Sequence, residues 1–489
     1  MKSLLPVLPI LGVVIMIFSG TMVLPLSVAW FFADGAATAY APAMAVTFLC
    51  GALLWFAGLR AKRELDRRDG MLLVSLVWTL IPVFACLPLL AYFHQAGAPI
   101  SFTDAYFEAV SGLTTTGSTV LVGLDKLPSS INLWRCFLQW LGGMGILVLM
   151  VAVLPLIGVG GSQVFNAESA GPMKESKLTP RMAQTAKGLW MVYSLISLAC
   201  VVAFRLGGMT WMDAWMHMFT TMSLGGLSSH DASFGFFQSP VLEWICVIFM
   251  VIASCNFAVY FMAVRKRSFH RILNDGELRA TVAVLIGSSL LVTVFLLVTG
   301  TYQSVEEATR LAFFNVISIA STTGYATTDY TLWPAFAPLF MLVLSGVATS
   351  AGSTGAGIKM VRVIILFKQT KRELLRILHP RLVAPIRVNG TEVSQPTVFA
   401  VLSFAMLYGT TTIAITMALA ASGLDFETSF SAVIATINNA GPGLHKVGPA
   451  GNYQGLTDLQ TWLCSVAMLL GRLEVLSLVV IFTPTFWQR

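Results

Sequence analysis

The fold is decided by four short segments, which read Thr114-Thr115-Thr116-Gly117-Ser118, Ser223-Leu224-Gly225-Gly226-Leu227, Ser321-Thr322-Thr323-Gly324-Tyr325 and Asn438-Asn439-Ala440-Gly441-Pro442. When they are aligned on Gly117, Gly226, Gly324 and Gly441, each has a polar residue three positions before the glycine. An aromatic residue stands eleven positions before it, and these aromatic residues are Tyr106, Trp215, Phe313 and Phe430. Because matched offsets recur roughly every hundred residues, the chain after about residue 70 is predicted to be a fourfold tandem repeat.

The chain around these segments is far more apolar than a water-soluble protein. Its 489 residues are 56% hydrophobic and only 11% charged, whereas a soluble domain is about 45–50% apolar and about 25% charged. The sequence therefore predicts an integral membrane protein. The seven cysteines form no CxxC pair and no cluster with histidine, so they are expected to be packing residues.

Ten stretches are long and apolar enough to cross the hydrocarbon core, which takes about 20 residues in a helix. They lie at 9–32, 38–59, 71–93, 132–158, 188–206, 240–264, 280–300, 334–366, 397–421 and 459–485. The four glycine segments are too short and too polar to span, and they are predicted to be re-entrant near 102–118, 211–227, 309–325 and 426–442. Such backbone is tolerated at membrane depth only where protein buries it or where it lines a water-filled cavity.

The predicted fold class is therefore an all-α polytopic membrane protein with ten transmembrane helices and four re-entrant pore helices. These helices are predicted to form four tandem span–pore loop–span repeats around a pseudo-fourfold axis. Residues 1–69 are assigned to two additional N-terminal transmembrane helices. The repeats are assigned to residues 70–170, 171–275, 276–390 and 391–489.

The positions of the charges predict an orientation. Lysine and arginine favour cytoplasmic loops, and 22 of the 30 lie in four alternate loops at 60–70, 172–188, 264–280 and 359–390. This bias predicts a multi-pass protein with both termini in the cytoplasm and a net acidic outer face, which concentrates cations. The net charge of +7 is thus an orientation signal, and no nucleic-acid partner is expected. Asp104, Asp213 and Glu427 have an alternative role, because acids also stabilise helix N-termini.

The re-entrant segments are predicted to bind a cation through the backbone. A short helix that enters from outside points its C-terminus, with about half a negative charge, at the middle of the bilayer. The strand that follows can present carbonyls that replace the water shell of a cation, and glycine permits the torsions that this needs. The alternative interpretation is that the four segments are simple turns that join helices and bind no ion. The candidate filter residues are Thr115, Thr116, Gly117, Leu224, Gly225, Gly226, Thr322, Thr323, Gly324, Asn439, Ala440 and Gly441.

The four segments resemble those of the Trk/Ktr/HKT superfamily of potassium transporters, most closely the bacterial TrkH-type membrane subunit. The resemblance covers about residues 70–489, and the two spans before residue 60 fit the TrkH type. It implies potassium uptake across the cell inner membrane through a channel-like pore, with potassium as the transported ion, no organic cofactor on this chain and one filter glycine per repeat. Glycine in all four repeats fits the potassium-selective pattern of the family.

The filter glycine of the second repeat has two candidates. Gly225 and Gly226 are adjacent there, and Leu224 stands where two of the other segments have threonine. The downstream match of His230-Asp231 to Thr328-Asp329 favours Gly226.

An interrupted helix is predicted in the span 334–366, because glycine and small polar residues in series form helix poorly. The resemblance implies an intramembrane gating loop, and a helix kink is the alternative. Arg472, a charge inside the last span, is functional by default. The resemblance implies that it lies at the gate, and a pair with a neighbouring helix is the alternative. The candidate gate residues are Ser350, Gly352, Ser353, Thr354, Gly355, Gly357 and Arg472.

The sequence also bears on the partners of the chain and on alternative functions. The resemblance implies a homodimer and a cytosolic nucleotide-binding regulatory subunit of the TrkA type. The basic amphipathic stretch 359–390 fits either that subunit or anionic membrane lipid. A secondary transporter with alternating access would be expected to have inverted repeats, whereas these copies are parallel; coupling to protons or sodium stays open. The chain is predicted not to be an enzyme, since it has no Ser/His/Asp set, HExxH motif or paired intramembrane acids.

Overall fold

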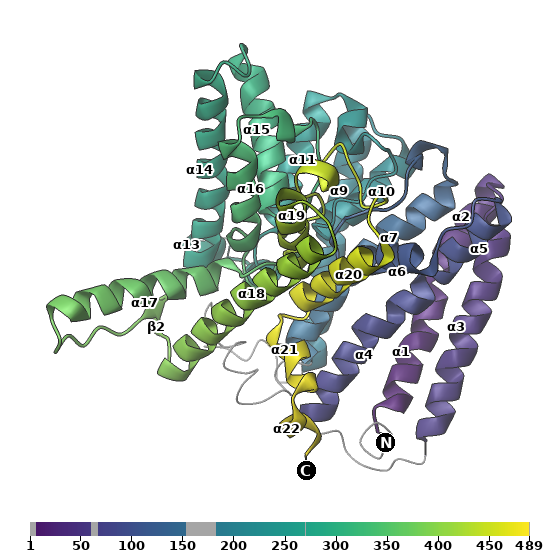
Figure 1. Cartoon of the computed structure of the whole chain (residues 1–489), viewed down its shortest axis with the longest axis horizontal. Helices are drawn as coiled ribbons and strands as arrows, with labels where there is room; N and C mark the ends of the chain where they lie inside the picture. Colours follow the sequence, from purple (N-terminus) through teal and green to yellow (C-terminus); the bar gives the residue numbers. More distant parts are fainter. Residues whose placement is uncertain (1–5, 60–66, 153–181, 269, 489) are drawn as a thin grey trace.

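A computed structural model describes residues 6–59, 67–152, 182–268 and 270–488. Helices make up most of this part of the chain (Figure 1). Most of the predicted cytoplasmic loop at 60–70, much of the loop at 172–188 and the end of the predicted span 132–158 lie outside the described residues.

The N-terminal region contains α1 (Leu8–Thr21), α2 (Val23–Phe32) and α3 (Ala37–Gly58). Helices α1 and α3 pack closely at Gly12 and Gly51, where a Cβ atom on Gly12 would lie 2.5 Å from the Gly51 carbonyl oxygen. Glycine at a helix contact lets two backbones approach in a membrane, where apolar surface alone does not drive association.

The rest of the chain repeats one order of elements four times: a long helix, a short helix, a 3-10 turn and a further helix. The first set is α4 (Arg67–Ala85) with α5 (Leu87–Gln95), α6 (Phe102–Leu113), η1 (Leu124–Lys126) and α7 (Ser129–Ala152). The second is α9 (Met182–Leu206), α10 (Trp211–Met222), η3 (Ser233–Phe237) and α11 (Pro240–Ala253). The third is α14 (Gly276–Val298), α15 (Val305–Ala320), η4 (Tyr330–Leu332) and α16 (Phe336–Val347), and the fourth is α18 (Gln395–Ala421), α19 (Phe426–Ile437), η5 (His445–Val447) and α20 (Asp458–Arg472).

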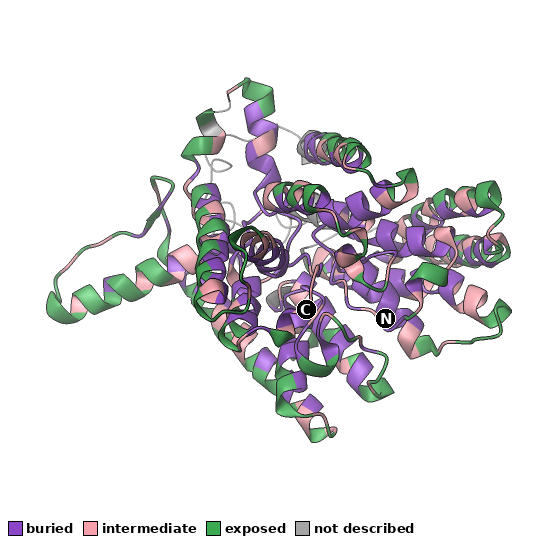
Figure 2. Ribbon diagram, turned by 90° about the horizontal axis from the view of Figure 1, so that it is seen from above, coloured by how far each residue is buried: buried purple, intermediate pink, exposed green. Residues whose placement is uncertain are grey.

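Shorter elements follow the second, third and fourth sets. They are α12 (Phe257–Lys266), α13 (His270–Asn274), α17 (Met360–Leu378), the antiparallel strands β1 (Arg387–Val388) and β2 (Thr391–Glu392), α21 (Leu476–Val479), η6 (Val480–Phe482) and α22 (Pro484–Trp487). Helices α1 and α22 reach the same end of the molecule, and α17 projects away from the bundle (Figure 1). Figure 2 shows exposed residues along that projecting helix and buried residues concentrated in the bundle.

The short helices have well-defined N-termini. Each begins after a residue whose side chain accepts a hydrogen bond from a backbone N–H of the first turn, and these caps are Ser101, Thr210, Ser304 and Asp425. Asp104, Asp213 and Glu427 lie in the first turns, as expected for acids that stabilise helix N-termini. Helix α15 has 16 residues against 12 in each of the others, and this extra turn explains why its acids occur earlier in the sequence.

Some of the predicted spans are not single helices. Six stretches of the described chain are long and apolar enough to cross a membrane: Leu8–Phe32, Ala37–Gly58, Arg68–Gln95, Ala186–Leu206, Gly276–Val298 and Gln395–Ala421. The predicted spans 240–264 and 459–485 are broken helices. The first bends by 85° between α11 and α12, where Asn256 caps the new helix, and the second stops where Glu474 and Val475 have positive φ angles. The span 334–366 is interrupted between α16 and α17.

In two of the four sets, a glycine lets the last helix pack directly against the end of the short helix. A Cβ atom on Gly142 in α7 would lie 1.8 Å from the Leu113 carbonyl oxygen at the end of α6. A Cβ atom on Gly471 in α20 would lie 1.9 Å from the Ile437 carbonyl oxygen at the end of α19. Both contacts hold the end of a short helix directly against a backbone, with no space for a side chain.

We expect Gly142→Ala to lower the free energy of unfolding by about 1–3 kcal/mol, because the added methyl group overpacks the contact between α6 and α7. The matched control is Gly287→Ala in α14, where nothing lies within 4 Å of the added Cβ atom. Thermal unfolding of the purified protein in detergent would measure both. Equal melting temperatures for the two variants would contradict the close packing at Gly142.

Candidate functional site

All four short helices end in the same backbone motif. In each, two N–H groups beyond the helix bond back to carbonyls five and three residues earlier, which is the Schellman pattern. The longer bonds run from Thr116 N to Ser111 O (2.9 Å), Gly225 N to Thr220 O (2.8 Å), Thr323 N to Ser318 O (2.8 Å) and Ala440 N to Ala435 O (2.8 Å). The chain therefore leaves α6, α10, α15 and α19 by one shared geometry.

This motif requires a left-handed residue just after the helix, a position that glycine and asparagine usually occupy. Here the residues and their φ angles are Thr115 (56°), Leu224 (54°), Thr322 (66°) and Asn439 (51°). A β-branched or bulky residue in this conformation costs about 1–3 kcal/mol, and such strain clusters at functional sites. Three of the four segments thus have a strained residue at this position, where glycine or asparagine would adopt the same conformation with less strain.

Two residues further on, the four aligned glycines also have positive φ angles. The angles are 85° at Gly117, 70° at Gly226, 85° at Gly324 and 83° at Gly441. Gly226, and not its neighbour Gly225, therefore has the backbone conformation of the other three glycines. Alternating left-handed residues at matched positions give the four strands one backbone form despite their different side chains.

The four glycines form a closed ring. A Cβ atom on Gly117 would lie 2.0 Å from the Gly225 carbonyl oxygen, and one on Gly226 would lie 1.9 Å from that of Thr323. The corresponding distances are 2.3 Å from Gly324 to the Ala440 oxygen and 2.8 Å from Gly441 to the Thr116 oxygen. Each segment thus lies against the next, and the fourth returns to the first. No side chain fits at any of the four positions without displacing a backbone carbonyl.

A cavity opens directly beside this ring. Its lining includes all four glycines together with residues that follow them, among them Ser118, Ser228, His230, Asn452 and Tyr453. Some carbonyls of the ring are already hydrogen-bonded: Gly225 O accepts from Gln139 Nε2 (2.7 Å), and Gly441 O accepts from Ser118 Oγ (2.9 Å) and Tyr453 Oη (3.0 Å). These bonds hold the backbone of the ring in place.

The predicted gate residues lie on the other side of the short-helix ends. The segment between α16 and α17 is non-helical, and Ser350, Ser353 and Thr354 are fully buried. Thr354 Oγ1 donates to the Met222 carbonyl at the end of α10 (2.9 Å), and Ala356 N donates to Thr322 Oγ1 (3.3 Å). The segment therefore contacts the helix ends of the second and third sets.

Arg472 joins this segment to the first set. Its guanidinium donates to the Thr354 carbonyl (3.0 Å) and to the Gly142 carbonyl in α7 (3.0 Å), and it lies 5.6 Å from the centre of the Trp78 ring. The arginine thus contacts backbone of the candidate gate, and its hydrogen-bond partners are carbonyl oxygens.

The glycines of the segment have distinct packing roles. A Cβ atom would lie 2.4 Å from Asn256 Oδ1 at Gly352, 2.7 Å from Thr349 Cγ2 at Gly355 and 2.8 Å from the Gly346 carbonyl oxygen at Gly357. Since Gly352 and Gly357 also have positive φ angles, neither tolerates a side chain without strain. The segment is a tightly packed loop rather than a simple kink in a continuous helix.

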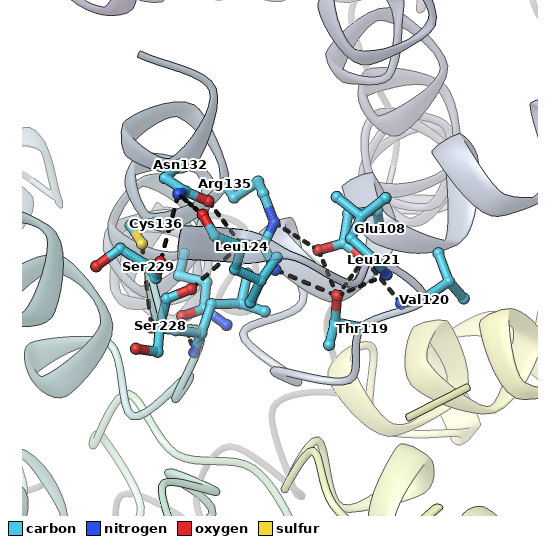
Figure 3. Close-up of polar contacts among 12 residues, drawn as sticks. Glu108, Thr119, Val120, Leu121, Leu124, Asn132, Arg135, Cys136, Ser228 and Ser229 are labelled. Atoms are coloured by element: carbon cyan, nitrogen blue, oxygen red, sulfur yellow. Dashed lines mark hydrogen bonds and ion pairs between the residues drawn. The ribbon is translucent and has the colours of Figure 1, made fainter. Parts of the chain in front are cut away.

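A set of buried polar residues on the short helices was not predicted from the sequence. Glu108 forms an ion pair with Arg135 (2.7 Å) and accepts hydrogen bonds from Thr119 and from the backbone of Val120 (Figure 3). Counted back from the aligned glycine, His217 and Asn315 stand at the same position as Glu108, and Ser431 stands one position earlier. A polar residue nine or ten positions before each glycine was the signal that could have found them.

A histidine with two aspartates lies at the rim of the cavity. His230 Nε2 lies 3.2 Å from Asp213 Oδ1, and its Nδ1 atom lies 2.5 Å from Asp125 Oδ1. Burial lowers the pKa of His230, but hydrogen bonds and charges from Asp213 and Asp125 outweigh it, so the pKa is raised above its ordinary value. Burial raises the pKa of Asp213, whereas its hydrogen bonds with His230 and Thr210 bring that pKa down to about 2.

Comparison with known proteins identifies relatives over the whole chain. The TrkH family model, described as a cation transport protein, matches residues 37–489. The Trk system potassium uptake protein TrkH of Vibrio parahaemolyticus is 44% identical over 485 residues, which cover 99% of each chain. TrkH of Escherichia coli is 41% identical over 480 residues, 98% of each chain. The crystal structure of the potassium transporter TrkH from Vibrio parahaemolyticus superposes with a TM-score of 0.90 at 41% identity, covering 100% of this chain and 99% of that one.

We expect the pairing of His230 to stabilise the fold in a pH-dependent way. A raised pKa in the folded state gives stabilisation that is fully present below the ordinary value of about 6.5 and is lost as the pH rises through the folded-state pKa. The melting temperature of wild type minus that of His230→Gln should therefore be larger at pH 6 than at pH 8, as thermal unfolding would measure. His94→Gln, which removes an exposed histidine of α5, is the control. A difference that does not change with pH would contradict the charged pairing.

Proposed function

The chain belongs to the TrkH family of cation transport proteins, and from this premise we propose that it takes up potassium across the cell inner membrane through a channel-like pore. Relatives that match nearly its full length are named potassium uptake proteins. The observation that carries the proposal is the closed ring of four glycines, in which four chain segments of one backbone form surround a cavity. A single axial cation fits such a ring better than an asymmetric organic substrate does.

Backbone carbonyls of the four strands are the proposed ligands of the ion. Oxygen dipoles arranged in rings can replace the water that a potassium ion loses. The C-termini of four short helices add partial negative charge near the ring. Variation of the side chains at equal backbone geometry supports this choice of ligand. The proposed filter consists of Thr115, Thr116, Gly117, Leu224, Gly225, Gly226, Thr322, Thr323, Gly324, Asn439, Ala440 and Gly441.

The proposed architecture is ten membrane crossings and four pore helices arranged about one pseudo-fourfold axis. Its units are residues 1–69, 70–170, 171–275, 276–390 and 391–489. The fourfold order of elements supports these boundaries, and broken helices such as α11–α12 count as one crossing each. Both termini are proposed to be cytoplasmic, in keeping with α1 and α22 reaching the same end of the molecule (Figure 1).

The buried loop between α16 and α17 is the proposed gate. It lies against the ends of α10 and α15, and Arg472 links it to α7. Opening of the gate would break the bonds of Thr354 to Met222 and Arg472, which link the loop to α10 and α20. The gate residues are Ser350, Gly352, Ser353, Thr354, Gly355, Gly357 and Arg472.

The projecting helix α17 is the proposed contact for partners. Its outer part is basic and exposed, with large apolar residues such as Phe367 and Ile377 on its surface. A TrkA-type nucleotide-binding subunit, a second copy of the chain and membrane lipid are the proposed partners, and the printed name "Trk system" of the relatives implies further components. No organic cofactor and no chemical reaction are proposed.

We expect Gly117→Ser to reduce the selectivity for potassium over sodium on the order of tenfold, the factor that about 1.4 kcal/mol of lost discrimination produces. The serine side chain would displace the Gly225 carbonyl from the ring. Potassium, rubidium and sodium uptake in a potassium-requiring host would measure the ratio. Gly123→Ser is the matched control, because Gly123 also has a positive φ angle but has open space around it. Unchanged selectivity in Gly117→Ser would reject the filter.

We expect deletion of Gly352–Gly357 to increase potassium flux, because it removes the buried segment next to the ring. Thr354→Val is a milder variant that removes only the hydroxyl bond to the Met222 carbonyl, and it should raise the flux by a smaller amount. Rubidium flux into proteoliposomes, normalised to protein content, would measure both. If the correctly folded deletion variant carried no more rubidium than wild type, the loop would not be a gate and would serve only in packing.

A further inference from the structure

Each short helix carries one buried polar side chain that holds the strand beyond the glycine. Glu108 accepts a hydrogen bond from Val120 N (3.1 Å), and Thr327 N donates to Asn315 Oδ1 (3.2 Å). Leu444 N donates to Ser431 Oγ (2.9 Å), and His217 Nε2 lies 3.0 Å from Ser228 Oγ. All four side chains belong to residues that are at most 1% exposed. We call these four residues the strand anchors.

Three of the anchors are neutral. Asparagine and serine carry no charge, and full burial favours the neutral form of the His217 ring. Its Nδ1 atom lies 2.9 Å from the Asp213 carbonyl oxygen, which can only accept a hydrogen bond, so Nδ1 carries the proton. Nε2 is then the acceptor, and the Ser228 hydroxyl donates to it. Glu108 is the one anchor with a charge.

Within the part of the chain that the structure describes, the charge of Glu108 is paired with Arg135 in α7. The two side chains are 0% and 1% exposed, and Arg135 Nε donates to Glu108 Oε1 at 2.7 Å. The guanidinium also donates to Asn132 Oδ1 (3.1 Å), Thr119 Oγ1 (3.2 Å) and the Ser228 carbonyl of the second glycine segment (3.2 Å), as Figure 3 shows. The pair therefore connects the strand of the first set to that of the second.

Arg135 is also part of the cavity wall, together with the four glycines. A permanent cation at this place would repel potassium, since a charge next to a low-dielectric cavity acts with little screening. Neutral anchors such as Asn315 make a similar strand contact without an arginine. The carboxylate of Glu108 therefore does more than hold the strand: it cancels a positive charge beside the path of the ion.

We propose that Glu108 and Arg135 are positioning residues that set the affinity of the pore for its cation, and this rests on the proposed potassium pathway. The carboxylate fixes the first strand and neutralises Arg135, whose guanidinium fixes the second strand through Ser228. The net charge of the pair at the cavity wall, rather than either contact alone, determines how strongly potassium is attracted.

The test compares the Michaelis constant for potassium uptake in three variants. Glu108→Gln leaves Arg135 charged and should raise the constant about fivefold, the factor for a unit charge about 8 Å away at an effective dielectric of about 40. Arg135→Gln leaves Glu108 charged and should lower it. Glu108→Gln with Arg135→Gln should return it to within about twofold of wild type. Arg205→Gln, which removes an exposed cation at the end of α9, should leave it unchanged.

A merely structural pair predicts a different pattern. Loss of either partner would then reduce the maximal rate and the amount of folded protein in both single variants, with no opposite shifts in the Michaelis constant. Shifts in the same direction, or no shift, would overturn the proposal. If Glu108→Gln does not fold, Arg135→Gln decides: a lowered constant that reverts in the double variant supports the proposal, and any other result overturns it.

The same uptake assay separates this proposal from the one on which it rests. If wild type carries no potassium, or Gly117→Ser keeps its selectivity, the pore itself is rejected. If Gly117→Ser loses selectivity while the single variants at 108 and 135 shift together, only the role of the ion pair fails.

Discussion

The structure depends on a contact that admits no side chain: the approach of each aligned glycine to a carbonyl of the next segment. At Gly117 and Gly226 an added Cβ atom would lie 2.0 and 1.9 Å from an oxygen. Four such contacts close a ring only if all four short helices end at the same depth with the same exit geometry. The shared Schellman motif provides that geometry, and the strain at Thr115, Leu224 and Thr322 is the cost of keeping it.

The polar groups near this ring are held by many bonds, because an unpaired polar group is costly away from water. Gln139 of the first set bonds to Gly225 O and Leu227 N, and Ser118 Oγ donates to Gly441 O, so neighbouring segments are joined by side chains as well as by packing. The guanidinium of Arg472 finds carbonyl partners on one side of the helix ends, whereas Arg135 finds a carboxylate near the cavity. The bonds of Gln139 and Ser118 hold the backbone of the ring in place.

The sequence was sufficient for the parts of the fold that follow from periodicity and register. It predicted the re-entrant segment near 102–118 that contains α6, favoured Gly226 over Gly225, and located the interruption between α16 and α17. It failed at the breaks after Ala253 and Arg472, because apolar composition continues through them while local capping by Asn256 and positive φ angles at Glu474 and Val475 end the helices. It also missed Glu108 with Arg135, since their pairing depends on how α6 packs against α7 and not on any local pattern.

The central claim is that the four glycine segments together form one potassium site. Its most direct test is anomalous diffraction from crystals of the protein soaked in rubidium, which replaces potassium and scatters strongly. We expect a rubidium peak on the axis of the ring, close to carbonyl oxygens of all four segments. Ordered rubidium bound only at the acidic rim near Asp125 and Asp213, with an empty ring at saturating concentration, would contradict it.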